Sequence, residues 1–191
     1  MADITKIERM TTAEYMQKYP ETEQLMELIE GEVCMSPAPH DDHQYISGEL
    51  YSVIRAIVKQ FAAGDIRYSP TDVHLDDYNI VQPDIFYVSN NNDRCNRTDA
   101  GYWHGAPDLV IEILSPGTSR RDRVDKFALY EKHGVREYWI VEPQGNFIEV
   151  YVLHEGKYQR QGAYKENESF TSTVVPQLTV QITNVFPVDA E

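Results

Sequence analysis

The chain of 191 residues has only two cysteines, Cys34 and Cys95, and they form no Cys-x-x-Cys pair. Neither a disulfide framework nor a thiolate zinc site is therefore indicated. Long apolar runs are also missing, since none approaches the roughly 18 residues that a membrane span needs. The first residues lack a basic region followed by an apolar one. These absences predict a soluble, cytoplasmic protein without a membrane partner.

Positive charge is scarce as well: 17 Lys and Arg residues stand against 31 Asp and Glu residues, for a net charge of −14. Nucleic-acid binding is driven by cationic side chains that displace condensed counterions. The balance therefore argues against a general DNA-coating protein, although an enzyme needs only a locally basic surface. The one clearly net-positive stretch lies between Ser119 and Arg136 and includes Arg120, Arg121 and Arg123.

Repeats, low-complexity tracts and linkers are absent too, so we expect a single domain over residues 1–191. Thr11 and Glu14 have the spacing of a capping box, which predicts a short helix ending near Lys18. Apolar periodicity predicts a longer amphipathic helix over residues 42–63, with Gly64 as its stop, and another from 119 or 120 to 133, stopped by Gly134. Strands are expected at residues 25–29, 32–35, 71–75, 80–88, 109–114, 137–141, 147–153, 158–164 and 170–174, with a long polar loop over 89–105. The fold class is therefore α/β, in the broad sense that includes α+β, with an N-terminal hairpin, a mixed sheet flanked by two principal helices, and a C-terminal antiparallel extension.

Glu112 stands out because it is the single carboxylate in the apolar run from Leu109 to Leu114. An unpaired charge in a sheet core costs several kcal/mol, or the group is neutralised by a pKa shift. Glu112 therefore needs a partner, either a cation from a neighbouring helix or a bound metal ion. A buried ion pair with an arginine would meet the same need without any function.

A second carboxylate, Asp84, follows Pro83 at the start of an earlier predicted strand, and Lys126 lies in the helix after Glu112. Two converging carboxylates suit Mg²⁺ or Mn²⁺, which prefer oxygen ligands and keep several waters. A lysine beside such a metal can contact a scissile phosphate or help to deprotonate the attacking water. Taken alone, however, Asp84 is typical of a turn residue, and Lys126 of a solvated helix lysine.

Several ordered motifs carry a family resemblance over roughly residues 10–186. They are Leu28-Ile29-Glu30-Gly31-Glu32-Val33, Met35-Ser36-Pro37, His43-Gln44, Val81-Gln82-Pro83-Asp84-Ile85, the run from Ala106 to Pro116, Asp125-Lys126, Tyr130 and the run from Gly134 to Val141. In these the chain resembles the Uma2 family of proposed endonucleases, formerly a domain of unknown function. The resemblance implies a restriction endonuclease-like fold of the PD-(D/E)xK class and hydrolysis of nucleic acid.

The resemblance assigns Asp84 as the motif aspartate and Glu112 as the acidic residue of the (D/E)xK element. Both would bind Mg²⁺ or Mn²⁺, with the Ile113 carbonyl as a further ligand. Leu114 stands where the lysine of the pattern belongs. In the Uma2 group the lysine moves to the following helix, which makes Lys126 the candidate.

Other residues receive accessory roles. Glu32 matches the additional acidic residue that this nuclease class often supplies from its first elements. His43 lies in the first turn of the long helix, on its core-facing side, and with Tyr130 it is a possible accessory residue. Arg120, Arg121 and Arg123 are candidates for binding the phosphate backbone, or they form only a solvated helix face. Asp108 shares the strand parity of Glu112 but lies about 13 Å away, so a structural role is expected.

The expected function is therefore metal-dependent cleavage of nucleic acid, with DNA the favoured substrate and a homodimer the expected assembly. Two alternatives stay open. One is a catalytically weak or inactive nucleic-acid-binding or interaction module of the same fold, which the displaced lysine and the net charge of −14 would favour. The other is a metal-dependent hydrolase whose substrate is not nucleic acid.

Overall fold

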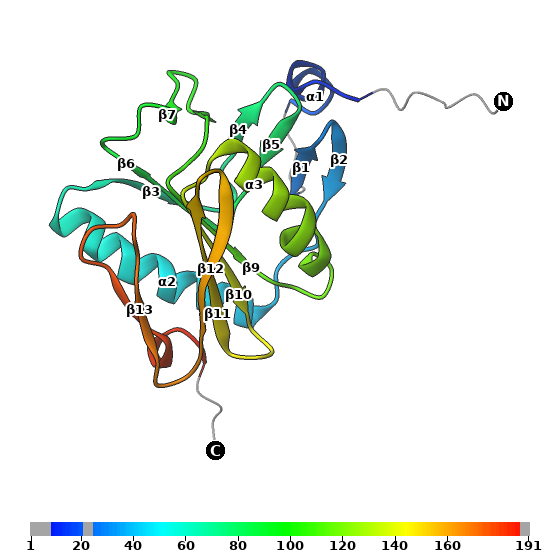
Figure 1. Ribbon diagram of the computed structural model, residues 1–191. Coiled ribbons are helices and arrows are strands. Elements are labelled where there is room, and N and C mark those ends of the chain that lie inside the picture. The colour runs from blue at the N-terminus through cyan, green and yellow to red at the C-terminus, as the bar shows by residue number, and fades with distance from the viewer. Residues whose placement is uncertain (1–8, 21–24, 188–191) are drawn as a thin grey trace.

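The computed structural model describes residues 9–20 and 25–187 (Figure 1). Its helices are α1 (Thr12–Lys18), α2 (Asp41–Gln60), the π-helix η1 (Arg121–Lys126), α3 (Phe127–His133) and the 3₁₀-helix η2 (Ile182–Asn184). The strands are β1 (Met26–Ile29), β2 (Glu32–Met35), β3 (Gly64–Tyr68), β4 (Val73–Asp76), β5 (Asn79–Val81), β6 (Ile85–Ser89), β7 (Asn96–Arg97), β8 (Trp103–His104), β9 (Leu109–Ile113), β10 (Glu137–Glu142), β11 (Phe147–His154), β12 (Lys157–Tyr164), β13 (Ser169–Thr171) and β14 (Thr179–Gln181). None of the described helices is long and apolar enough to cross a membrane.

The strands form two six-stranded sheets rather than the single central sheet expected from the sequence. The first, which we call the central sheet, has the order β12-β11-β10-β9-β6-β3, and the hairpin sheet has the order β2-β1-β5-β4-β8-β7. In the central sheet β9 and β10 are parallel and joined by η1 and α3, while the other neighbours are antiparallel. A crossover helix is the usual way to connect parallel neighbours. The structure is therefore a mixed α/β fold, with a separate pair formed by β13 and β14.

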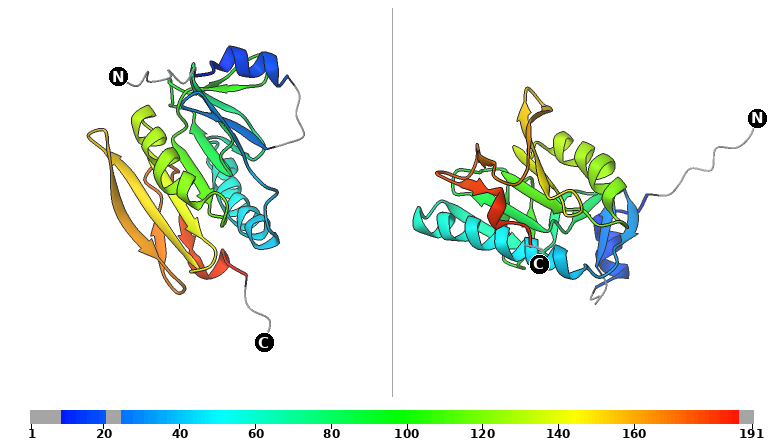
Figure 2. Two further views of the ribbon diagram at one scale, coloured as in Figure 1. Left: turned by 90° about the vertical axis from the view of Figure 1, so that its right-hand side faces the viewer. Right: turned by 90° about the horizontal axis from the view of Figure 1, so that it is seen from below.

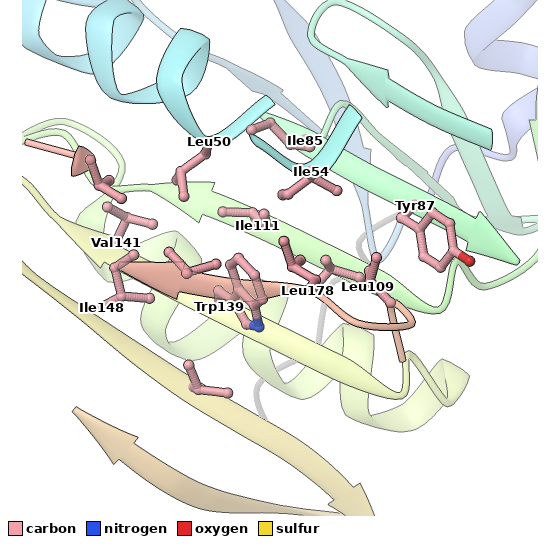
Figure 3. Close-up of a cluster of buried hydrophobic side chains, with 14 of the residues drawn as sticks. Leu50, Ile54, Ile85, Tyr87, Leu109, Ile111, Trp139, Val141, Ile148 and Leu178 are labelled. Atoms are coloured by element: carbon pink, nitrogen blue, oxygen red, sulfur yellow. The ribbon is translucent and has the colours of Figure 1, made fainter. Parts of the chain in front are cut away.

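The central sheet is covered by a helix on each face (Figure 2). Strand β9 alternates: Leu109, Ile111 and Ile113 belong to the core cluster that contains α2 residues, and Val110 and Leu114 to the one that contains α3 residues. Figure 3 shows Leu50 and Ile54 of α2 packed over Ile111 and its neighbours. Because side chains alternate along a strand, Glu112 has the same parity as Val110 and Leu114. It therefore faces α3.

The N-terminal elements follow the sequence expectations closely. Thr11 accepts a hydrogen bond from the Glu14 backbone, and the Glu14 side chain accepts one from the Thr11 backbone, which completes the capping box of α1. Strands β1 and β2 form the antiparallel hairpin. Tyr15 of α1 packs against Met26, Leu28 and Ile80. Helix α1 thus lies on the hairpin sheet and away from the central sheet (Figure 1).

Two expectations about the middle of the chain are wrong. The strand expected over residues 80–88 is two strands, β5 and β6, which belong to different sheets. Pro83 lies between them and has no N–H to donate to a ladder, so the chain leaves one sheet and enters the other there. The long helix ends at Gln60, not at residue 63, and Gly64 begins β3, a strand that the sequence did not predict.

Gly64 is required at the start of β3 by a close backbone contact. Its φ is +151°, and an ideal Cβ at this position would lie 2.1 Å from the Val88 carbonyl oxygen. Any residue other than glycine at position 64 would therefore push the paired strands β3 and β6 apart.

We expect Gly64→Ala to lower the free energy of unfolding by roughly 1–3 kcal/mol, because the new methyl group requires a strained backbone. Gly48→Ala is the matched control, since no atom lies within 4 Å of its Cβ position in α2. It should raise stability by up to about 1 kcal/mol through helix propensity. Urea denaturation measures both variants, and equal effects at the two positions would contradict the prediction.

Candidate active site

Asp84 and Glu112 are brought together by the register of β6 and β9. Ile85 pairs with Ile111 in this antiparallel ladder, so one step further places Asp84 opposite Glu112. The Ile113 N–H donates to Asp84 Oδ2 at 2.7 Å, which fixes the carboxylate to the end of β9. Asp84, Glu112 and Ile113 line the same cavity. The residues that the sequence assigned to the metal therefore gather at one place.

The cation that Glu112 requires is Lys126. Its Nζ lies 2.9 Å from Glu112 Oε1, and the Tyr130 hydroxyl donates to the same oxygen at 2.6 Å. Only 3% of Glu112 and 4% of Lys126 are exposed. Lys126 comes from the last turn of η1 and Tyr130 from α3, so the helix that crosses the Glu112 face of the sheet supplies both partners.

Glu27 of β1 is a third acidic residue at this site, and the sequence analysis missed it. Its Oε1 lies 2.8 Å from Lys126 Nζ and accepts a hydrogen bond from the Gln82 backbone, also at 2.8 Å. Gln82 stands two residues before Asp84. One carboxylate from the hairpin sheet thus holds both the lysine and the segment that carries the aspartate. The available signal was a lone Glu in the apolar run Leu25-Met26-Glu27-Leu28-Ile29, the same pattern that singled out Glu112.

The charges at this site do not balance. Asp122 Oδ1 lies 3.8 Å from Lys126 Nζ, so one ammonium serves Glu27, Glu112 and Asp122. Burial raises the pKa of Glu112 well above its usual value, and the nearby carboxylates add to the rise while Lys126 opposes it. Burial lowers the pKa of Lys126, but the surrounding carboxylates outweigh this effect and raise it well above normal. The lysine is therefore protonated at neutral pH, whereas the raised pKa of Glu112 favours the neutral acid unless a further cation compensates its charge.

His43 approaches Asp84 from the first turn of α2. Its Nε2 lies 3.2 Å from Asp84 Oδ2. Burial acts to lower the pKa of His43, but the hydrogen bond and charge of Asp84 more than offset it, so the pKa is raised. The core-facing orientation expected from helix periodicity places this ring against a candidate metal ligand.

These groups line a cavity of about 230 Å³. Its floor contains the buried acidic residues and Lys126, and its rim includes Pro37, Pro39 and Tyr68. A second cavity of about 450 Å³ shares His43 and Ser115 with the first. The two hollows therefore adjoin at the start of α2.

The three arginines of the basic stretch separate in space. Arg121 lines the first cavity and donates to Ser36 Oγ at 3.1 Å, with Glu27 Oε2 4.0 Å away. Arg123 instead pairs with Glu149 and Glu142 of the neighbouring strands. Arg120 is exposed. Only Arg121 is therefore placed beside the candidate metal ligands.

Glu32 lies outside the cavity. It is exposed on β2, opposite Ile29 in the hairpin, whereas Glu27 occupies the inward position on β1. The hairpin does supply an acidic residue, but a different one from the residue expected. Asp108 has the structural surroundings expected of it: Oδ2 accepts the Ser89 N–H at 2.8 Å, and Oδ1 pairs with Arg136 at 3.2 Å.

The chemistry of the donors fits a small divalent cation. Among the described residues, the hydrogen bonds to Glu112 reach Oε1 and those to Asp84 reach Oδ2, so each carboxylate keeps a second oxygen. The same part of the chain contains no group of three or more His, Cys, Asp or Glu side chains arranged around one metal position. Mg²⁺ commonly takes only one or two carboxylates, with waters and substrate phosphate completing its shell.

The chain has relatives among known proteins. The model of the Uma2 family, described as "Putative restriction endonuclease", matches residues 12–184. The chain belongs to the Uma2 family. A solved structure of similar fold, described as "a putative nuclease belonging to DUF820" from Anabaena variabilis, has a TM-score of 0.76 and 27% sequence identity. The match covers 93% of this chain and 97% of the Anabaena variabilis chain.

A curated relative is 24% identical over 147 residues, which cover 75% of this chain and 74% of the relative. It is an uncharacterized protein from Synechocystis sp.. The matches therefore establish the family and the fold, and they assign neither an activity nor a substrate to this Uma2 chain.

We expect Lys126→Met to lower the free energy of unfolding by about 3–5 kcal/mol near neutral pH, because it leaves buried carboxylates without their cation. The deficit should be smaller at about pH 5 than at about pH 8. Without the lysine, the folded state holds protons that the unfolded carboxyl groups release above their normal pKa, so stability falls as pH rises. Urea denaturation of variant and wild type at both pH values measures the difference.

Lys132→Met provides the matched control. Lys132 lies on α3, which directly follows η1, but 58% of its side chain is exposed and its partner Glu30 is half exposed. The substitution should change stability by no more than about 1 kcal/mol at either pH. A Lys126→Met deficit that is equally small, or that does not depend on pH, would contradict the electrostatic account.

Proposed function

We propose that this protein is a divalent-metal-dependent endonuclease that hydrolyses nucleic-acid phosphodiester bonds, with DNA as its substrate. The observation that carries the proposal is the joint placement of Asp84, Glu112 and Lys126. The two carboxylates line one cavity, and the lysine contacts Glu112 at 2.9 Å. This set would supply the metal ligands and the cation that phosphodiester hydrolysis requires. Leu114 stands where the PD-(D/E)xK pattern has its lysine, and Lys126 from the following helix would take the role of that lysine.

Asp84 and Glu112 would hold Mg²⁺ or Mn²⁺ through Asp84 Oδ1 and Glu112 Oε2, the oxygens that accept no hydrogen bond from Ile113 or Lys126. The Ile113 carbonyl would be a further ligand. When bound, such a cation polarises a phosphoryl oxygen and lowers the pKa of water. The protein itself orients the carboxylates. The Ile113 N–H and His43 fix Asp84, while Tyr130 and Lys126 fix Glu112. Ligands whose rotamers are set by such contacts are preorganised for the metal.

Lys126 is suited to binding charge and not to accepting a proton. Its raised pKa keeps the ammonium protonated, so it can donate hydrogen bonds to a scissile phosphate or hold a water. This favours the phosphate-contacting role over the proton-removing role, both of which the sequence left open. Arg121, on the same cavity, is the second candidate for contact with phosphate.

A non-catalytic binding module is the second candidate function. One observation favours it: Lys126 is already surrounded by Glu27, Glu112 and Asp122, which compete with a phosphate for its ammonium. Nucleic-acid binding without cleavage would be the expected result. The homodimer stays a prediction under either function.

The nuclease proposal predicts that purified protein cleaves DNA with Mn²⁺ or Mg²⁺, and that Asp84→Asn and Glu112→Gln abolish cleavage by removing a charged metal ligand. Product formation on single- and double-stranded DNA, separated on a denaturing gel, measures this. Chelation by EDTA should stop the reaction, and readdition of metal should restore it. If the wild type cleaves no nucleic acid while still binding it, the binding module is the correct function.

The hairpin glutamates sharpen the same assay. Glu27→Gln should reduce cleavage by about 10- to 100-fold, because Glu27 orients Lys126 and the segment before Asp84. Glu32→Gln should leave the rate unchanged, since that side chain is exposed and outside the cavity. The reverse ranking would restore the sequence-based assignment of Glu32.

Metal binding can be tested without any activity. A cation that binds only the folded state at 100 times its dissociation constant stabilises it by about 2.7 kcal/mol. We therefore expect saturating Mn²⁺ to raise the urea midpoint of the wild type, and Asp84→Asn to remove the increase. Ca²⁺ titration and the Asp77→Asn variant, changed in the β4–β5 turn, provide comparisons. Equal Mn²⁺ stabilisation of wild type and Asp84→Asn would place the metal elsewhere.

A further inference from the structure

Tyr68 is a large aromatic side chain left exposed at the rim of the cavity. It ends β3, is 55% exposed, and lines the same hollow as Asp84 and Lys126. Tyr51 of α2 packs edge-on against it, with ring centroids 4.7 Å apart. The ring is therefore supported from one side while more than half of its surface stays open to solvent.

The backbone connects Tyr68 directly to the candidate metal ligands. Tyr68 pairs with Ile85 in the β3–β6 ladder, and the Ser69 N–H donates to the Asp84 carbonyl oxygen at 3.0 Å. A group stacked on Tyr68 would thus lie beside the strand end that positions Asp84. Because both contacts are backbone contacts between β3 and the start of β6 in the central sheet, they place the Tyr68 backbone next to that of Asp84.

The cavity is poorly suited to a double helix. Glu112, Asp122 and Lys126 are each less than 5% exposed, so they lie at the base of a hollow of about 230 Å³. A scissile phosphate must therefore reach groups that lie below the surface of the protein. Duplex binding is also driven by many phosphate contacts. The residues that line the cavity include a single lysine, already paired, and a single arginine.

We propose that the cavity takes a single-stranded polynucleotide, with one base stacked on Tyr68 and the adjoining phosphate directed toward Asp84 and Glu112. This inference rests on the proposed nuclease function for the role of the acidic residues, while the stacking site itself requires only binding. Every base presents a π-face, so aromatic stacking tolerates any sequence and contributes about 1–3 kcal/mol per base. The apolar side chains of Pro37 and Pro39 on the same rim suit the flat faces of a base.

Fluorescence anisotropy tests the inference with a labelled oligodeoxynucleotide of mixed sequence, its RNA counterpart, and the DNA duplex, in Ca²⁺ to limit cleavage. We expect a single strand, DNA or RNA, to bind more tightly than the duplex. Tyr68→Leu, which keeps an apolar side chain but removes the π-face, should weaken single-strand binding by about 5- to 150-fold. Tyr68→Trp should retain it. The DNA and RNA arms distinguish the two polynucleotides.

Tyr78→Ala is the matched control, because Tyr78 is also an exposed tyrosine, at 42%, but lies between β4 and β5 in the hairpin sheet. It should bind like the wild type, and thermal unfolding checks that each variant is folded. Duplex binding equal to or tighter than single-strand binding, or unchanged binding by Tyr68→Leu, would overturn the inference. A Tyr68-dependent single-strand affinity without cleavage in Mn²⁺ would instead overturn the nuclease function and leave the stacking site standing.

Discussion

The ammonium group of Lys126 is the interaction on which the arrangement of this site depends. It joins Glu112 of the central sheet, Glu27 of the hairpin sheet and Asp122 of its own helical segment. Three elements that are separate in the chain thus meet at one buried positive charge. Removing water from such a group is costly unless several carboxylates compensate. The same carboxylates outnumber the lysine, so burial and their mutual repulsion raise the pKa of Glu112.

Pro83 has a comparable effect on Asp84. It separates β5 from β6 along the chain, and the chain changes sheets at this point. The Ile113 N–H, just past the last paired residues of β6 and β9, then donates to the Asp84 carboxylate at 2.7 Å. A side chain thereby takes a donor at the end of a strand, where a buried N–H needs a partner. The Asp84 carboxylate is consequently fixed to the end of β9.

Local patterns in the sequence predicted most elements of the fold and the need of Glu112 for a partner, whereas the family resemblance pointed to Asp84 and Lys126. The capping box at Thr11, the alternation around Glu112 and the stop at Gly134 are all signals that operate within a few residues. Glu27 and the division into two sheets depend on partners distant in the chain, such as Gln82 and Lys126, which no local pattern specifies. The mistaken strand over residues 80–88 has the same origin. Ile80, Val81 and residues 85–88 favour β structure, whereas Pro83 and Asp84 do not. The sheet to which each half belongs depends on partners distant in the chain.

The hairpin position of Glu27 also has a consequence for how the protein folds. Glu112 and Lys126 are 14 residues apart and join through one crossover connection, whereas the chain between Glu27 and Lys126 includes the strands β2 to β9. Contacts between distant segments carry a larger loop-closure cost and tend to form after local ones. We therefore expect Lys126 to meet Glu112 before it meets Glu27. A partly folded chain would then contain the central pair while lacking the contact that orients it, and the geometry of the site would be completed only when the hairpin sheet docks.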